Sequence, residues 1–357
     1  MGFPVEPVAM VAKVVIIPVI LMTSVPLWVW VERRGSAFIQ DRLGPNRASI
    51  CGFTFFGLLH MVADAIKAFT KESFVPSQAH RFYYLIAPGV ALVSALMAFA
   101  VIPISDDLMV GTHRIPMSIA QVDGGLVYVF AMASLGVLGI ILAGWAAGSK
   151  YPLLGALRTA GQMLSYEVSL GLAALGAFLA FGTLDPNEIV RAQGGTLAGV
   201  VPLWGILVQP LGFILFLVAG FAECNRLPFD LPEGESELVA GYHTEYSGMK
   251  FAMFYMSEYI AMITFASLVV TLFFGGWQVP WVSTIRMVSV IGPLSAMVVQ
   301  IGAFAVKVAF FVWLFIWVRW TLPRFRYDQL MRLGWMVILP LSLANIAVTA
   351  FVMALVG

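Results

Sequence analysis

The chain has 357 residues, of which 61% are hydrophobic and only 11% are charged. An ordinary soluble domain is about one quarter charged, so this composition excludes a water-soluble globular protein and indicates one that uses lipid as part of its solvent. The formal net charge of +1 gives no indication of a nucleic-acid partner.

Eight stretches are long and apolar enough to cross a bilayer, whose core requires about 20 apolar residues in a helix. They are expected at 8–31, 84–104, 124–144, 161–183, 201–221, 255–275, 291–318 and 333–356. The stretches are continuously apolar instead of alternating, which predicts an all-α polytopic membrane protein and not a barrel. The whole chain, 1–357, is expected to form a single integral membrane domain.

The basic residues are distributed unevenly among the loops. Fifteen Lys and Arg residues lie in the loops after the first, third, fifth and seventh spans, whereas the other loops hold only Arg114, Arg191 and Arg286. Cytoplasmic loops carry the excess of basic residues, so both termini are expected on the non-cytoplasmic side. No basic residue precedes Lys13 and no small-residue cleavage site follows, so the first stretch is expected to remain as a helix.

The first cytoplasmic loop, 32–81, contains a helical pattern. Its polar positions share one helical face: His60, Asp64, Lys67 and Lys71. This predicts an amphipathic helix that lies in the membrane interface or packs on the spans, either as a plain anchor or with a functional role. The segment before it, ERRGSAFIQDRLGPNR, carries Arg33, Arg34, Arg42 and Arg47. These arginines either anchor the loop or form a structured basic segment at a partner or a pocket.

The loop 221–254 is rich in acidic residues. It contains Glu223, Asp230, Glu233, Glu235, Glu237 and Glu245. The acids alternate with apolar residues such as Phe229 and Leu231, which a merely solvated loop does not need. The pattern therefore favours a surface packed against another protein. The closely spaced glutamates lack the spacing of a calcium-binding loop, so no metal site is expected.

Several charged residues fall inside or at the ends of the apolar spans. Glu167 lies in the fourth span, Glu223 ends the fifth, Glu258 lies near the start of the sixth and Lys307 lies within the seventh. A charge at the bilayer centre costs roughly 2.5–3.5 kcal/mol on insertion scales, so these side chains are expected to face the bundle interior or a water-filled path. For Glu167 a functional role is favoured, whereas a structural hydrogen bond or ion pair is an equal alternative for the other three.

No motif for redox or covalent chemistry is present. The two cysteines, Cys51 and Cys224, are far apart, and no histidine lies in a strongly apolar stretch. Neither a dinucleotide-binding glycine motif nor a nucleophile elbow occurs. The chain is therefore expected to bind no cofactor or metal and to hold no catalytic residue by itself.

Three segments carry a family resemblance. FAECNRLPFDLPEGESELVAGYHTEYSG (221–248), followed by FYMSEY, closely resembles the signature loop of the NADH–quinone oxidoreductase membrane subunit that is called H in bacteria, and of its mitochondrial counterpart. ERRGSAFIQDRLGPNR resembles the other signature of that family, and GQMLSYEVSLGL matches its fourth-span motif. Two departures are visible: Cys224 stands where the family usually has threonine, and GSAFIQDR is less aliphatic than expected.

The resemblance implies a membrane subunit of a complex I-type enzyme in the bacterial inner membrane, with quinone as substrate. Its implied partners are hydrophilic redox-arm subunits at the cytoplasmic loops, with small and antiporter-like membrane subunits beside it. By motif, Glu167, Glu223 and Glu258 are implied in proton coupling. Arg226, Asp230, Glu233, Glu235, Glu237 and Glu245 are implied in the quinone chamber, and Arg33, Arg34, Arg42 and Arg47 at its entrance.

Two other functions remain as alternatives. Membrane anchors of hydrogenases and of formate- or ferredoxin-linked complexes have homologous subunits with the same helices. The nearly complete acidic loop favours the quinone-linked enzyme over these. A stand-alone transporter fits less well, because the cytoplasmic loops are large and polar.

Overall fold

The computed structural model describes residues 5–50, 52–110, 113–197, 201–231, 238–282 and 284–356. Within these residues, seven helices are long and apolar enough to cross a membrane. Six of them are α1 (Val5–Ile39), α3 (Arg81–Ala98), α4 (Gly125–Ala146), α5 (Lys150–Phe181), α10 (Gly248–Phe273) and α12 (Pro293–Thr321). The seventh joins α13 (Tyr327–Leu333), a π-helical turn (Gly334–Ile338) and α14 (Leu339–Val356). The prediction of an all-α polytopic membrane protein is confirmed.

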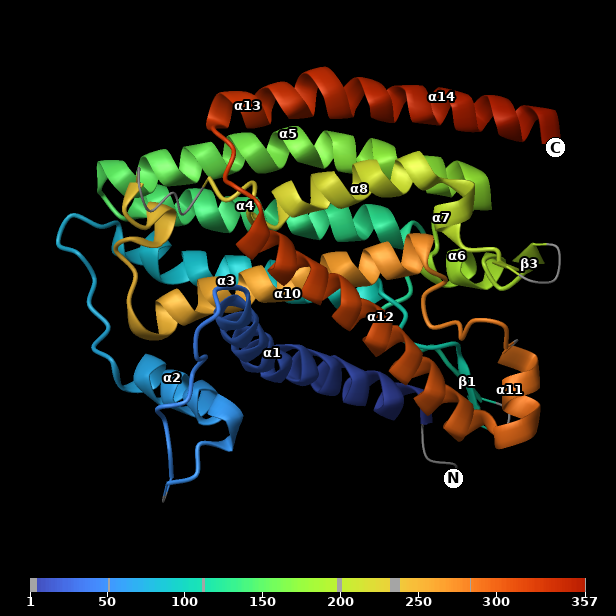
Figure 1. The fold of residues 1–357 in the computed structure, drawn as a ribbon, viewed down its shortest axis with the longest axis horizontal. Coiled ribbons are helices and arrows are strands. Elements are labelled where there is room, and N and C mark those ends of the chain that lie inside the picture. The colour runs from blue at the N-terminus through green and yellow to red at the C-terminus, as the bar shows by residue number, and fades with distance from the viewer. Residues whose placement is uncertain are drawn as a thin grey trace.

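The bundle is centred on α10. Nearly every residue of α10 from Tyr259 to Phe273 is buried, whereas α1 and α14 expose large apolar side chains along most of their length. Figure 1 shows α10 (orange) among the other long helices, with α1 below it and α14 along the upper edge. Small residues allow the closest approaches: a Cβ added at Gly139 of α4 would lie 2.8 Å from the backbone nitrogen of Ala91 in α3.

The fifth predicted span is not one continuous helix. The stretch 201–221 begins with β4 (Val201–Pro202) and the single turn α7 (Gly205–Val208), and only then forms α8 (Pro210–Glu223). Pro210 has no N–H to donate to the preceding turn, so the helix restarts there. At 1.5 Å per residue, the 14 residues of α8 span about 21 Å, less than the roughly 30 Å of a bilayer core.

Polar side chains compensate for this interruption. Gln209, at the break, donates through Nε2 to Oγ1 of Thr349, and Asn345 Nδ2 donates to Gln209 Oε1 at 3.0 Å. Both partners lie on α14, and all three side chains are buried. A Cβ at Gly176 of α5 would meet the Asn345 side chain at 2.8 Å, so this glycine makes room for the network.

Two helices extend beyond the apolar stretches that predict them. α1 continues past residue 31 to Ile39, so Glu32 and the two arginines after it belong to a helix and not to the loop. α5 begins at Lys150, well before the predicted start at 161. Charge alone does not end a helix, and Pro152 lies in the first turn of α5, where proline is tolerated.

The connections hold short elements. The predicted amphipathic helix of the first loop is confirmed as α2 (Leu59–Thr70), which has no buried residue and lies beside one end of α1 (Figure 1). Antiparallel pairs join β1 (Leu108–Val110) to β2 (His113–Ile115) and β3 (Thr196–Leu197) to β4. The remaining short helices are α6 (Pro186–Ala192), α11 (Thr284–Ile291) and 3₁₀ turns at Phe55–Gly57, Phe99–Val101 and Gly241–His243.

Candidate functional site: a buried charge cluster between two cavities

Four charged side chains from distant parts of the chain meet inside the bundle. Arg226 Nη1 lies 3.1 Å from Glu32 Oε2, and Arg226 Nε lies 2.8 Å from Glu258 Oε1. Arg319 Nη1 approaches the other oxygen of Glu32 at 2.5 Å. We call Glu32, Arg226, Glu258 and Arg319 the charge cluster. Its two arginines balance its two carboxylates, which is the condition under which charges tolerate burial.

Tyrosines complete the cluster. Tyr259 donates from its hydroxyl to Glu32 at 2.5 Å, and its ring centroid lies 4.4 Å from the guanidinium carbon of Arg226. The Tyr255 and Tyr259 hydroxyls are 3.2 Å apart. Burial opposes the charge of Arg226, but the carboxylates of Glu258 and Glu32 outweigh it and raise the pKa of Arg226 well above its ordinary value. Arg226 therefore stays charged although only 2% of it is exposed.

The segment after α8 places Arg226. Asn225 adopts a left-handed conformation (φ 49°), and Gln162 of α5 donates to its Oδ1 at 3.2 Å and to the Ala222 carbonyl at 2.7 Å. A few residues later, Asp230 accepts from Arg324 at 3.0 Å. The segment is thus fastened on one side to α5 and on the other to the connection after α12.

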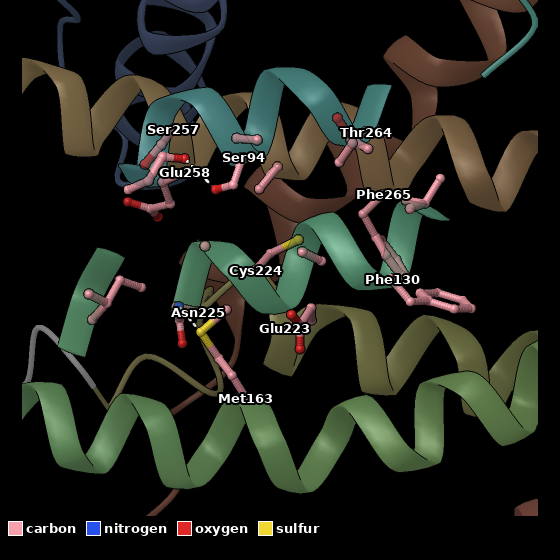
Figure 2. Close-up of a pocket in the computed structure, with 18 of the residues that line it drawn as sticks. Ser94, Phe130, Met163, Glu223, Cys224, Asn225, Ser257, Glu258, Thr264 and Phe265 are labelled. Atoms are coloured by element: carbon pink, nitrogen blue, oxygen red, sulfur yellow. Dashed lines mark hydrogen bonds between the residues drawn. The ribbon is translucent and has the colours of Figure 1, made fainter. Parts of the chain in front are cut away.

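A cavity of about 110 Å³ lies beside the cluster, among α3, α4, α5, α8 and α10; we call it the inner cavity. Glu223 and Glu258 both line it. Figure 2 shows Glu258 next to Ser257 and Ser94, while Glu223 lies closer to Met163 of α5. Both Glu223 carboxylate oxygens are buried and accept no hydrogen bond from the described residues. A single water needs roughly 10–15 Å³ of such space, so the cavity has room for several.

Glu167 lies on α5, near Glu223. It projects from α5 toward α4, is half-buried, and accepts a hydrogen bond from the Ser134 hydroxyl. The Glu167 charge is close enough to repel that of Glu223. Of the three carboxylates predicted from their place in apolar stretches, Glu223 and Glu258 therefore line one cavity, and Glu167 lies near Glu223.

A larger cavity of about 760 Å³ lies between α1, α2 and α10; we call it the lateral cavity. Residues of α1, α2 and α10 form most of its wall. Its polar residues from this loop are His60, Asp64 and Lys67 of α2 and Lys71, directly after that helix. Arg33 of α1 also lines it and pairs with Asp64 at 2.5 Å, which ties α2 to the end of α1. Tyr255 of α10 connects this wall to the charge cluster through its hydroxyl contact with Tyr259.

The other residues singled out from the sequence are more scattered. Arg34, Arg42 and Arg47 are exposed, and they are not among the residues that line the lateral cavity. Glu245 is half-buried, and its backbone carbonyl accepts from the Tyr84 hydroxyl at 2.7 Å. Glu233, Glu235 and Glu237 lie outside the described residues.

In the same loop, burial lowers the pKa of His243 to about 4, although the charge of Asp230 acts in the opposite direction. The His243 imidazole is therefore neutral at pH 7, and the interior of this loop carries no histidine charge there. The part of the chain that the structure describes contains no group of three or more His, Cys, Asp or Glu side chains that could hold a metal ion.

Sequence reasoning misses Glu32, Arg319 and the two tyrosines. From the sequence, Glu32 is the first residue of a loop, and Arg319 is only one of the basic residues that set topology. Their role depends on contacts across 194 and 287 residues of chain. One signal is present: Glu32 is the single acid directly before two arginines at the end of an apolar stretch, a place where a partner is needed.

Lys307, the remaining charged residue within an apolar span, has a structural role. Its ammonium group donates to the carbonyls of Phe274, Gly276 and Gln278 at 2.8, 3.0 and 2.7 Å, just beyond the end of α10. Lys307→Met should lower the free energy of unfolding by about 1.5–3 kcal/mol, because these carbonyls lose a charged donor. Thermal unfolding in detergent measures the loss, with the exposed Lys150→Met as control. Equal unfolding temperatures for both variants would contradict this role.

Similarity to known proteins extends over nearly the whole chain. The sequence model of the NADH dehydrogenase family matches residues 12–350. The chain belongs to the NADH dehydrogenase family. Similar proteins, each named as the H subunit of NADH-quinone oxidoreductase, occur in Bdellovibrio bacteriovorus, at 46% identity over 95% of this chain and 94% of the relative, and in Cytophaga hutchinsonii, at 40% over 98% of each. A Rhizobium meliloti protein, named as a second H subunit of this kind, is 44% identical over 94% of each. The matched residues thus include the charge cluster and the lining of both cavities.

Proposed function

We propose that this chain is the H-type membrane subunit of an NADH–quinone oxidoreductase, and that it admits quinone through the lateral cavity and couples quinone reduction to proton transfer. One observation carries the proposal: a continuous series of contacts joins the two cavities. Tyr255 lines the lateral cavity and contacts Tyr259. Tyr259 donates to Glu32, and Arg226 joins Glu32 to Glu258, which lines the inner cavity.

The chemistry of quinone reduction fits this arrangement. Reduction to quinol adds two electrons and two protons, and negative charge develops on the head group before the protons arrive. The charge cluster, in which arginines neutralise carboxylates, would respond to a nearby negative charge, because that charge attracts the arginines and repels the carboxylates. The carboxylates of buried Glu223 and half-buried Glu167 would pass protons through the membrane part. Electrons would come from partner subunits, and the chain would bind no redox cofactor.

The placement of the loops supports an orientation. In Figure 1, α1 begins and α14 ends at the right-hand end of the bundle, opposite α2. The loops rich in Lys and Arg lie at the α2 end, which would be cytoplasmic. The redox-arm subunits would cover that end, the membrane subunits would lie beside the helices, and both termini would face the outside of the cytoplasmic membrane.

Blocking the lateral cavity tests the proposal. Ala68→Trp, on the cavity side of α2, is expected to lower quinone reduction by about tenfold or more, because the indole takes the space of the ligand. NADH oxidation by a water-soluble acceptor should be unchanged in the purified complex. Ala63→Trp, on the same helix but away from the cavity, is the matched control.

The outcomes separate the alternatives. Full quinone reduction by the Ala68→Trp complex would overturn access through this cavity. Purification in mild detergent adds a second test: co-purified NADH dehydrogenase activity supports the proposal, whereas a hydrogenase partner would overturn it.

A further inference from the structure

The hydroxyl of Ser134 lies between two acceptors. On one side it is 3.0 Å from the backbone carbonyl of Phe130, one turn earlier in α4. On the other side it contacts Oε1 of Glu167 in α5. A serine hydroxyl has one hydrogen and two lone pairs, so it cannot donate to both acceptors at once.

This geometry satisfies both protonation states of Glu167. When Glu167 is charged, the Ser134 hydroxyl donates to the carboxylate. When Glu167 is protonated, its O–H donates to Ser134 Oγ, and the serine hydrogen turns to the Phe130 carbonyl. Rotation about one C–O bond exchanges the two arrangements, and neither leaves a hydroxyl hydrogen unpaired. An unpaired polar group in an apolar interior is costly, so two fully paired states are close in free energy.

We propose that Ser134 is a positioning residue that allows Glu167 to bind and release a proton in place, without movement of α4 or α5. The proton binds to and leaves Glu167, and the serine keeps its own hydrogen throughout. This inference rests on the proposed role of Glu167 in proton coupling and adds the group that makes both of its states stable.

Other serines near the site lack this geometry. Ser165, two residues before Glu167, donates to the Gly161 carbonyl at 2.6 Å, and Ser94, on the wall of the inner cavity, donates to the Ala91 carbonyl at 2.9 Å. Each bonds to its own helix and to no carboxylate in the described contacts. Glu223, by contrast, accepts no hydrogen bond from the described residues. Among these groups, Ser134 and Glu167 form the pair with two satisfied states.

The test replaces Ser134 with alanine in the intact complex, reconstituted in vesicles. A charged carboxylate loses a stronger hydrogen bond than a neutral carboxyl group does, so the variant favours protonated Glu167. We expect the pH at which quinone-linked proton translocation is half-maximal to rise by about half to one unit. Ser134→Thr keeps the hydroxyl and should restore the original pH dependence, and Ser165→Ala, whose serine bonds only within α5 in the described contacts, should leave it unchanged.

Infrared difference spectroscopy gives a readout besides turnover. The protonated-carboxyl band that Glu167→Gln removes should persist to higher pH in Ser134→Ala. If Ser134→Ala does not assemble, Ser134→Cys, which has a similar size and a weak donor, should show the same shift in smaller measure. An unchanged pH profile and band, in a complex where Glu167→Gln is inactive, would overturn the role of Ser134 and leave the proposed function intact. An active Glu167→Gln complex would overturn the proton role of Glu167 itself.

Discussion

Replacing Arg226 with methionine is expected to lower the free energy of unfolding by about 3–5 kcal/mol, because the change removes the buried cation that the carboxylates of Glu32 and Glu258 share. Arg226 contacts both Glu32 and Glu258, and methionine fills part of its volume but supplies no charge. Arg319 still contacts Glu32, so part of the charge balance of the cluster remains.

Thermal unfolding of the subunit within the purified complex measures this loss. Arg34→Met, at an exposed position of α1, is the control and should unfold as the natural chain does. The double variant Arg226→Met with Glu258→Gln removes a carboxylate together with its partner, and it should recover part of the lost stability. If Arg226→Met unfolds at the same temperature as Arg34→Met, the charge cluster does not stabilise the fold.

Glu167→Gln is expected to leave the complex assembled and to lower quinone-linked proton translocation by about tenfold or more, since a positioned proton donor or acceptor typically contributes roughly 10²–10⁴-fold. Glutamine keeps the size of the side chain and still accepts from Ser134, so folding should be preserved. The change removes only the ability to bind and release a proton.

Proton translocation in vesicles, measured beside NADH oxidation, tests this expectation. Glu188→Gln is the matched control, because Glu188 is exposed on α6 and bonds to Thr183 in the adjoining turn. Normal translocation by an assembled Glu167→Gln complex would remove Glu167 from the proposed proton path.

The membrane-spanning helices are predictable from the sequence, because the bilayer core requires a minimum length of apolar helix. The residues at which these helices begin and end are less predictable. The predicted first span stops at residue 31 because Glu32 is charged, but a buried partner allows the helix to continue through it. The predicted fifth span ignores Pro210, whose effect on the backbone outweighs the apolar character of its neighbours.

The candidate site likewise contains residues that the sequence predicts and residues that it does not. Glu167, Glu223 and Glu258 are predictable because an ionisable residue in an apolar stretch requires an explanation wherever it points. Glu32 and Arg319 are not predictable as site residues, because each lies at the end of a span, where charged residues are common. Only the crossing of α1, α10 and α12 brings them together with Arg226. Chain order does not predict such a crossing.

The Gln209 network has a consequence for biogenesis. Helices enter the membrane in the order in which they are made, and α8 is synthesised long before α14. The partners of Gln209, Asn345 and Thr349, follow it by 136 and 140 residues. Until they arrive, the broken start of α8 holds a side-chain amide in an apolar medium without these partners. The insertion of α14 therefore supplies the hydrogen-bond partners of a polar side chain that entered the membrane more than a hundred residues earlier.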